Sequence, residues 1–327
     1  MYYEDISQLV GHTPLVKLNR VTEGIRALIL AKLEFLNPGG SVKDRMAFFM
    51  LKQAEKSGEL KPGGTIVEAT SGNTGVAVAM YAAIKGHKAI FTIPDKMSQE
   101  KINVLKVFGA QVIVTPTDVP PDSPESYYEV AKRITKQTPN SYLIGQYQNQ
   151  NNPLAHYETT GPEIWEQTEG KIDYFIAGIG TGGTMSGTAR YLKEKKKTIQ
   201  AIAVDPEGSV YYDYFKTKNL ITPHPYLVEG IGEDMLCQTL HWDVIDDVVQ
   251  VTDKEAFSMA RELAKKEGIF AGGSSGAAVW AALELAKNLD EDQTLVVILP
   301  DSGARYLSKL YNDDWMKKNG FIPEEIS

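Results

Sequence analysis

Short apolar runs alternate with segments of helical periodicity along most of the chain. Runs rich in Val, Ile, Leu and Ala predict strands at 27–33, 65–68, 89–93, 111–115, 174–177, 201–204 and 295–299. Apolar residues spaced three and four apart predict helices at 41–56, 74–84, 99–108, 184–194, 254–266 and 275–288. Strands that alternate with helices in this way are typical of parallel sheets covered by helices, so we expect an α/β fold.

The 327 residues are enough for two such domains. The strand and helix rhythm repeats after a break near 145–153, so we expect an N-terminal domain over 1–147 and a C-terminal domain over 148–327. The segments 116–124 and 206–225 are expected to be loops because they are rich in Pro and Gly.

The composition narrows the class of protein. The 34 basic and 42 acidic side chains give a net charge of −8 without a basic stripe, so neither nucleic acid nor an anionic membrane is an expected partner. No apolar run reaches the roughly 18 residues of a membrane helix, and the N-terminus lacks a signal-peptide pattern. The single cysteine, Cys237, excludes an intrachain disulfide and fits a reducing, cytoplasmic compartment. The five histidines lack metal-ligand spacing, so no metal is expected.

A candidate reactive lysine lies in the segment Asn-Pro-Gly-Gly-Ser-Val-Lys-Asp at 37–44. Ser41 followed by Asp44 resembles a capping box, which would put Lys43 in the first turn of a helix. A cation there opposes the helix dipole, and burial would lower its pKa further. A neutral lysine amine can bond to a carbonyl carbon, although an exposed lysine is the simpler interpretation of this segment alone.

A candidate anion site is the segment Glu-Ala-Thr-Ser-Gly-Asn-Thr-Gly at 68–75, between a predicted strand and a predicted helix. Hydroxyl groups and free backbone N–H groups at a helix N-terminus bind anions, and the carboxylate of an amino acid is a natural occupant. A plain turn with a capping Ser71 or Thr74 explains part of this run but not all of it.

A glycine-rich loop, Gly-Ile-Gly-Thr-Gly-Gly-Thr at 178–184, can cradle a phosphate with its backbone N–H groups. Gly178, Gly180 and Gly183 also match the dinucleotide fingerprint G-x-G-x-x-G, with Asp205 about 20 residues later. The mid-chain position and the two segments described above disfavour a dinucleotide. This motif alone nevertheless does not decide between a phosphate-binding loop, a dinucleotide-binding loop and a plain tight turn.

A fourth segment, Gly-Ile-Phe-Ala-Gly-Gly-Ser-Ser-Gly at 268–276, opens another predicted helix. Ser274 or Ser275 is therefore a candidate N-cap. A serine hydroxyl at this place is also able to form a hydrogen bond with a ring nitrogen of a cofactor.

Together these segments resemble the cysteine synthase and cystathionine β-synthase family of pyridoxal-phosphate enzymes of fold type II. The resemblance extends from Gly-His-Thr-Pro-Leu at 11–15 to Trp315. Within the family it is strongest to the cystathionine β-synthases, on the segments Asp-Ser-Pro-Glu-Ser at 122–126, Asn-Pro-Leu-Ala-His-Tyr at 152–157, Asp-Pro-Glu-Gly-Ser at 205–209, Glu-Gly-Ile-Gly at 229–232 and Leu-Pro-Asp-Ser at 299–302.

The resemblance implies the fold of the tryptophan synthase β subunit. That fold has two domains, each with a mainly parallel twisted sheet, and the first segment of the chain packs on the C-terminal domain, which holds the cofactor phosphate. The active site lies between the domains, which close on the substrate, and the enzyme is a homodimer. The chain begins near the 11–15 motif and ends soon after Trp315, so we expect a catalytic core without the haem segment and regulatory domain of the animal enzymes.

The resemblance also implies a role for each site residue. Lys43 matches the lysine that holds the cofactor and removes the Cα proton, Asn73 binds the ring oxygen and Ser274 faces the ring nitrogen. The phosphate loop is matched by Gly180, Thr181, Gly182, Gly183 and Thr184. The residues implied to bind the substrate are Thr70, Ser71, Gly72, Thr74, Gln146, Tyr147, Gly230 and Glu233.

The implied reaction is a β-replacement that condenses L-serine or O-acetyl-L-serine with L-homocysteine to form L-cystathionine, with use or release of hydrogen sulfide as a further activity. Glu233 stands where the animal enzymes have tyrosine, so the donor stays open, and its carboxyl group either binds the amino group of homocysteine or faces solvent. The alternatives are a cysteine synthase that uses sulfide, an NAD-linked oxidoreductase that relies on Asp205, and a protein that only binds a partner.

Overall fold

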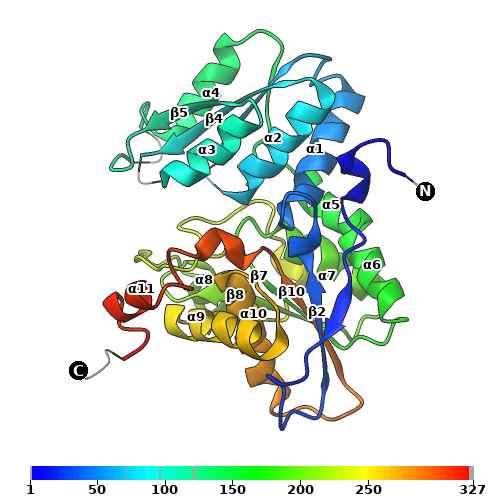
Figure 1. Cartoon of the computed structure of the whole chain (residues 1–327). Coiled ribbons are helices and arrows are strands. Elements are labelled where there is room, and N and C mark those ends of the chain that lie inside the picture. Colours follow the sequence, from blue (N-terminus) through cyan, green and yellow to red (C-terminus); the bar gives the residue numbers. More distant parts are fainter. Residues whose placement is uncertain (1, 71, 96, 121–122, 324–327) are drawn as a thin grey trace.

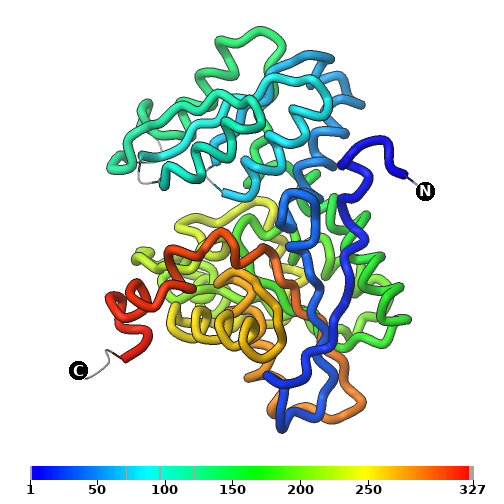
Figure 2. The backbone as a smooth tube through the Cα atoms, viewed as in Figure 1, coloured from blue at the N-terminus to red at the C-terminus, as the bar shows by residue number. Residues whose placement is uncertain are grey.

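The computed structural model describes residues 2–70, 72–95, 97–120 and 123–323, and its strands form two sheets (Figures 1 and 2). The four-stranded sheet has the order β5-β4-β3-β6. Its strands are β3 (Thr65–Ala69), β4 (Lys88–Pro94), β5 (Gln111–Thr115) and β6 (Ser141–Leu143). The six-stranded sheet has the order β1-β2-β10-β7-β8-β9. Its strands are β1 (Leu15–Lys17), β2 (Leu28–Leu33), β7 (Tyr174–Gly178), β8 (Gln200–Pro206), β9 (Asp247–Val251) and β10 (Thr294–Leu299).

Both sheets are built mainly of parallel strands. Every pairing in the four-stranded sheet is parallel, and in the six-stranded sheet the pairing of β1 with β2 is antiparallel while the others are parallel. Every residue of β3 and β10 is buried, which explains the nearly continuous apolar run of β10, while β3 also buries Thr65 and Glu68. The predicted α/β class is therefore confirmed.

The four-stranded sheet carries helices α1 to α4, in the upper part of Figure 1. Helix α4 packs against β3, β4 and β6, and α2 packs against β3 and β4. The bounds are α1 (Lys43–Ser57), α2 (Asn73–Lys85), α3 (Gln99–Val107) and α4 (Tyr127–Gln137).

The six-stranded sheet is covered on both faces. One apolar core joins its strands to α9 and α10, and a second joins them to α6, α7 and α8. Helix α5 packs against both α1 and α7, so it connects the two parts of the molecule. The bounds are α5 (Asn151–Glu158), α6 (Thr160–Gln167), α7 (Gly183–Lys195), α8 (Tyr211–Thr217), α9 (Asp253–Glu262), α10 (Gly273–Ala286) and α11 (Asp313–Lys318).

The order of the chain interleaves the two sheets. Strands β1 and β2 belong to the six-stranded sheet, and β2 pairs with β10 from the far end of the sequence. The chain then builds the four-stranded sheet and returns to the larger sheet at β7. The expected division between residues 147 and 148 stays a prediction.

Candidate active site

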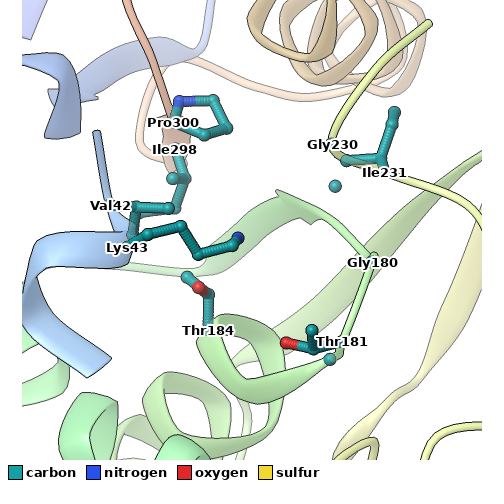
Figure 3. Close-up of a pocket in the computed structure, with 11 residues that line it drawn as sticks. Val42, Lys43, Gly180, Thr181, Thr184, Gly230, Ile231, Ile298 and Pro300 are labelled. Carbon is teal, nitrogen blue, oxygen red and sulfur yellow. The ribbon is translucent and has the colours of Figure 1, made fainter. Parts of the chain in front are cut away.

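A pocket lies where the start of α1 meets the glycine-rich loop before α7 (Figure 3). Lys43 extends into it from α1, with Thr181 and Thr184 on one side and Gly230 and Ile231 on the other. The lining residues are Val42, Lys43, Gly178, Gly180, Thr181, Gly182, Thr184, Gly230, Ile231, Ile298 and Pro300. The structure therefore brings the predicted reactive lysine to the predicted phosphate loop.

The environment of Lys43 favours an uncharged amine. Burial lowers the pKa of Lys43, and the negative charges of Asp301 and Glu233 only partly oppose this effect. The uncharged form of a lysine amine, which a lowered pKa favours, is both a nucleophile and a base. Lys43 is the first residue of α1, so it lies in the first helical turn, as the sequence predicts, although the helix begins two residues later than expected.

The capping box predicted for α1 is wrong. The N-cap is Val42, and its side chain makes no capping hydrogen bond. The Asp44 carboxylate instead accepts a hydrogen bond from the backbone N–H of Gly39, because the Pro-Gly-Gly turn folds back over the helix start. The Ser41 hydroxyl accepts from the backbone N–H of Lys43 at 3.3 Å, so it supports the reactive residue directly.

Close backbone approach explains the glycines of the phosphate loop. A Cβ atom on Gly180 would lie 2.8 Å from the carbonyl oxygen of Gly230. Gly182 has φ +87°, a left-handed conformation that favours glycine. Gly183, which does not line the pocket, begins α7, so the free N–H groups of a 13-residue helix point toward the loop.

The predicted carboxylate loop meets Gln146 from another part of the chain. The Thr74 hydroxyl donates to the side-chain oxygen of Gln146 at 2.8 Å, and both residues are buried. That bond leaves the Gln146 amide N–H groups to bind an anion. Thr70 is buried and Gly72 is exposed beside them, whereas Ser71 lies outside the described residues.

Asn73 faces a carboxyl group that the sequence analysis gave no role. Its amide donates to Asp301 at 2.8 Å, and the Tyr306 hydroxyl donates to the same oxygen at 2.7 Å. Burial raises the pKa of Asp301. Asp301 follows β10, and the carboxyl ends of parallel strands commonly carry functional groups, so its position was a usable signal.

Tyr147 belongs to an aromatic cluster near Glu233. Its ring packs edge-on against Tyr128 with 6.1 Å between the centroids, and Tyr128 packs on Tyr127 with 4.0 Å between the centroids. Burial raises the pKa of Glu233 to about 8, and nearby Asp234 adds to the shift while Lys43 opposes it. The two tyrosines of α4 were missed because α4 itself was not predicted.

The structure does not bring every predicted residue to the pocket wall. Ser274 is buried in the first turn of α10, but it does not line the pocket. The N-cap is Gly272, so the interpretation of Ser274 or Ser275 as a helix cap is wrong. The Ser275 hydroxyl has no hydrogen-bond partner among the described residues.

Asp205 is placed unfavourably for a ribose. It is fully buried near the end of β8, and its carboxylate accepts from the backbone N–H of Tyr212 at 2.9 Å. Burial raises the pKa of Asp205 to about 7. A buried carboxyl group that holds the start of α8 is not available to a nucleotide, which removes the acid of the dinucleotide fingerprint.

A family model described as pyridoxal-phosphate dependent enzyme matches residues 6–301. The chain belongs to this family. Its site residues fit the cofactor, because a buried amine faces a glycine loop at a helix N-terminus, where one group can bind an aldehyde and the other a phosphate.

Among the pyridoxal-phosphate enzymes, the chain is similar to several relatives named cystathionine beta-synthase. A cystathionine beta-synthase of Apis mellifera is 50% identical over 320 residues, covering 97% of this chain and 63% of the relative. That of Oryctolagus cuniculus is 48% identical over 323 residues, covering 98% of this chain and 58% of the relative. The chain thus spans about six tenths of the length of these relatives.

Two further relatives match over nearly their whole length. A cysteine synthase of Staphylococcus aureus is 44% identical over 313 residues, which is 95% of this chain and 98% of the relative. The crystal structure of a hydrogen sulfide-producing enzyme from Fusobacterium nucleatum superposes with a TM-score of 0.86 at 38% identity, covering 93% of this chain and 97% of that one.

The described part of this pyridoxal-phosphate enzyme holds no helix of the length and apolarity required to cross a bilayer. Within the same residues, no group of three or more His, Cys, Asp or Glu side chains is arranged to hold a metal ion.

Proposed function

We propose that this chain catalyses a β-replacement in which L-serine or O-acetyl-L-serine condenses with L-homocysteine to form L-cystathionine. The observation that carries the proposal is the Lys43 amine facing the phosphate loop, in a buried environment that lowers its pKa. The relatives named cystathionine beta-synthase support the choice of reaction.

In the proposed cofactor site, different residues bind different parts of the cofactor. Bound pyridoxal phosphate supplies an aldehyde carbon and a ring that withdraws electrons from the amino acid. Lys43 would hold the aldehyde carbon in the resting enzyme, and its amine, freed when the amino acid takes its place, would remove the Cα proton of the substrate. The backbone N–H groups and hydroxyls from Gly180 to Thr184 hold the phosphate, while Asn73 and Ser274 bind the ring oxygen and the ring nitrogen.

The proposed substrate site fixes the amino acid by its carboxylate. Gln146 offers amide N–H groups whose direction is set by the Thr74 hydroxyl on its side-chain oxygen. Thr70, Ser71 and Gly72 complete this anion site, and Tyr147 and Gly230 border the space for the β-substituent. A carboxylate held there keeps the Cα–H bond directed at the Lys43 amine.

Glu233 is the proposed partner of the second substrate. The pKa of about 8 leaves its carboxyl group largely protonated at neutral pH, and an approaching ammonium group favours the ionised form. Glu233→Ala should therefore raise the KM for homocysteine and leave the KM for sulfide, which has no amino group, unchanged. Equal effects on both nucleophiles would contradict this role.

The decisive experiment combines absorption spectra with product analysis. The purified protein, loaded with pyridoxal phosphate, is given L-serine or O-acetyl-L-serine and then homocysteine, and products are identified by mass spectrometry. We expect a visible band that shifts with the donor and returns with homocysteine, together with cystathionine. Lys43→Ala should abolish turnover. A wild-type protein without a visible band would overturn the proposal.

The second candidate is a cysteine synthase that joins O-acetyl-L-serine to sulfide, and the match to a cysteine synthase over 98% of that relative's length favours it. Release of hydrogen sulfide from cysteine is a related activity, in line with the Fusobacterium nucleatum structure. Comparing kcat/KM for homocysteine and sulfide with each donor separates these reactions.

The proposal extends to assembly and compartment. We propose a homodimer that works in the cytoplasm, and Cys237, which is buried, suits reducing conditions. Light scattering of the purified protein tests the dimer.

A further inference from the structure

Helix α5 lies directly against the start of α7, where the phosphate loop ends. A Cβ atom on Gly183 would collide with the side-chain oxygen of Asn152, and one on Gly187 would collide with the carbonyl oxygen of Pro153. Asn152 and His156 are four residues apart, so they share one face of α5, and both are 1% exposed. The buried polar side chains of Asn152 and His156 therefore lie against the phosphate loop and the start of α7.

Asn152 fixes the direction of one hydrogen bond to the loop. Its Nδ2 donates to the carbonyl oxygen of Gln146 at 2.9 Å and to the Thr181 hydroxyl at 3.0 Å. A carbonyl oxygen only accepts, so the bond to Gln146 requires that this amide atom is the nitrogen. The Thr181 oxygen therefore accepts from Asn152, and its own proton is left for another acceptor.

The His156 ring links two threonine hydroxyls through a chain of hydrogen bonds. Its Nδ1 lies 2.8 Å from Thr160 Oγ1, and its Nε2 lies 3.2 Å from Thr184 Oγ1. Burial lowers the pKa of His156 to about 3, and the positive charge of Arg45 contributes to the shift. The ring is therefore neutral with one proton, and the chain can run in either direction.

A bound phosphate would determine the direction of the hydrogen bonds along this chain. Phosphate oxygens accept hydrogen bonds, so Thr184 helps to bind them only if its oxygen accepts from His156 and its proton points away from the ring. We propose that Asn152 and His156 are positioning residues that turn the hydroxyl protons of Thr181 and Thr184 toward the cofactor phosphate, with the His156 proton on Nε2. This inference rests on the proposed function, which places the phosphate at this loop.

Affinity for pyridoxal phosphate tests the role of His156. His156→Phe keeps a ring but removes the donor, and we expect about tenfold weaker binding, which corresponds to about 1.4 kcal/mol. His156→Gln restores an N–H donor and should bind nearly as wild type. Affinity for pyridoxal, which lacks the phosphate, should be equal in all three proteins. Equal losses for both ligands would overturn the proposal.

A double-mutant cycle separates positioning from general damage to the fold. In the Thr184→Val background, His156→Phe should cause no further loss of affinity, because the hydroxyl that it orients is gone. The same holds for Asn152→Leu in the Thr181→Val background. Additive losses would contradict the inference. If neither Thr181→Val nor Thr184→Val weakens binding, the assignment of the phosphate loop itself fails.

A measurement on the wild-type holoenzyme avoids the risk that variants misfold. Nitrogen-15 NMR of the imidazole rings distinguishes a protonated ring nitrogen from an unprotonated one. His156 is assigned by comparison with His156→Gln. We expect a protonated Nε2 and an unprotonated Nδ1 with pyridoxal phosphate bound. The opposite tautomer would overturn the proposal.

Discussion

Buried carboxyl groups make the stability of this protein depend on pH. Burial raises the pKa of Asp44, Glu68 and Asp205 to about 7 each. Near neutral pH the folded protein therefore binds more protons at these groups than the unfolded chain does. The unfolding free energy falls as pH rises from the unfolded pKa through the folded pKa.

Glu68 is the residue at which this effect is easiest to test. It is 2% exposed and accepts a hydrogen bond from the backbone N–H of Gly145 at 3.0 Å, which glutamine can also accept. Its pKa rises from 4.5 to about 7, so Glu68→Gln should stabilise the protein by about 3 kcal/mol at pH 8 and little near pH 4. Urea unfolding at both pH values measures the difference.

The matched control for Glu68 is Glu169→Gln, since Glu169 is an exposed carboxylate that forms an ion pair with the neighbouring Lys171. It should leave the pH profile of stability unchanged. If Glu68→Gln gives the same stability change at both pH values, burial does not control the ionisation of this group.

The roles of some single residues could be predicted from the sequence, and those of others could not. Lys43 and the glycine loop were recognisable because a reactive lysine and a phosphate cradle need particular residue types at particular spacing. The partnership of Asn73 with Asp301 was not, because 228 positions separate them and no local pattern records which carboxyl group faces which amide. Folding alone brings such pairs together.

At the scale of elements, the position of Lys43 depends on what holds α1. Arg45, two residues after Lys43, makes paired hydrogen bonds to the buried carboxylate of Glu34 at 2.7 and 2.8 Å. It also binds Glu163 of α6 through two nitrogens at 2.7 Å each. This network ties the start of α1 to the six-stranded sheet, where the cofactor phosphate is proposed to bind.

Arg45→Met should be strongly destabilising. It leaves Glu34, which is fully buried, without its cation, and breaking one partner of a buried ion pair costs about 3–5 kcal/mol. Thermal and urea unfolding measure the loss. Arg26→Ala is the control, because the Arg26–Asp290 pair is exposed and should contribute nothing measurable. Comparable losses in the two variants would contradict a structural role for the network.

The elements that the sequence revealed are those with a regular apolar pattern. The seven predicted strands all formed, with bounds shifted by a few residues at most. Helix α5 was missed because its buried face carries Asn152 and His156, so apolar periodicity is absent. Helix α4 had a signal that was overlooked, since Ser126 caps it by accepting from the backbone N–H of Glu129.

For the whole molecule, the site depends on how the two sheets are held together. Asn73 of α2 and Asp301 after β10 make one contact between the parts built on each sheet. A second contact joins Lys101 of α3 to Glu229, next to pocket residue Gly230, at 2.6 Å. The family resemblance predicts that these parts close on the substrate, so we expect contacts of this kind to favour the closed arrangement.

Lys101 and Lys309 offer a matched pair of tests, because both bind Glu229 from different parts of the chain. Lys309 and Glu229 both lie in segments that pack on the core of the six-stranded sheet, whereas Lys101 lies on α3 of the four-stranded part. Both ion pairs are partly exposed and contribute up to about 1 kcal/mol, so Lys101→Ala should raise the KM for the amino-acid donor up to about fivefold.

The comparison with Lys309→Ala decides whether the contact between the two parts matters. Lys309→Ala removes a similar charge but no link between the sheets, so its KM should stay near the wild-type value. The Lys101 effect should shrink at high salt, because partly exposed charges are screened. If both variants raise KM equally, the loss comes from the charge of Glu229 itself, and the contact between the sheets plays no part in closing the site.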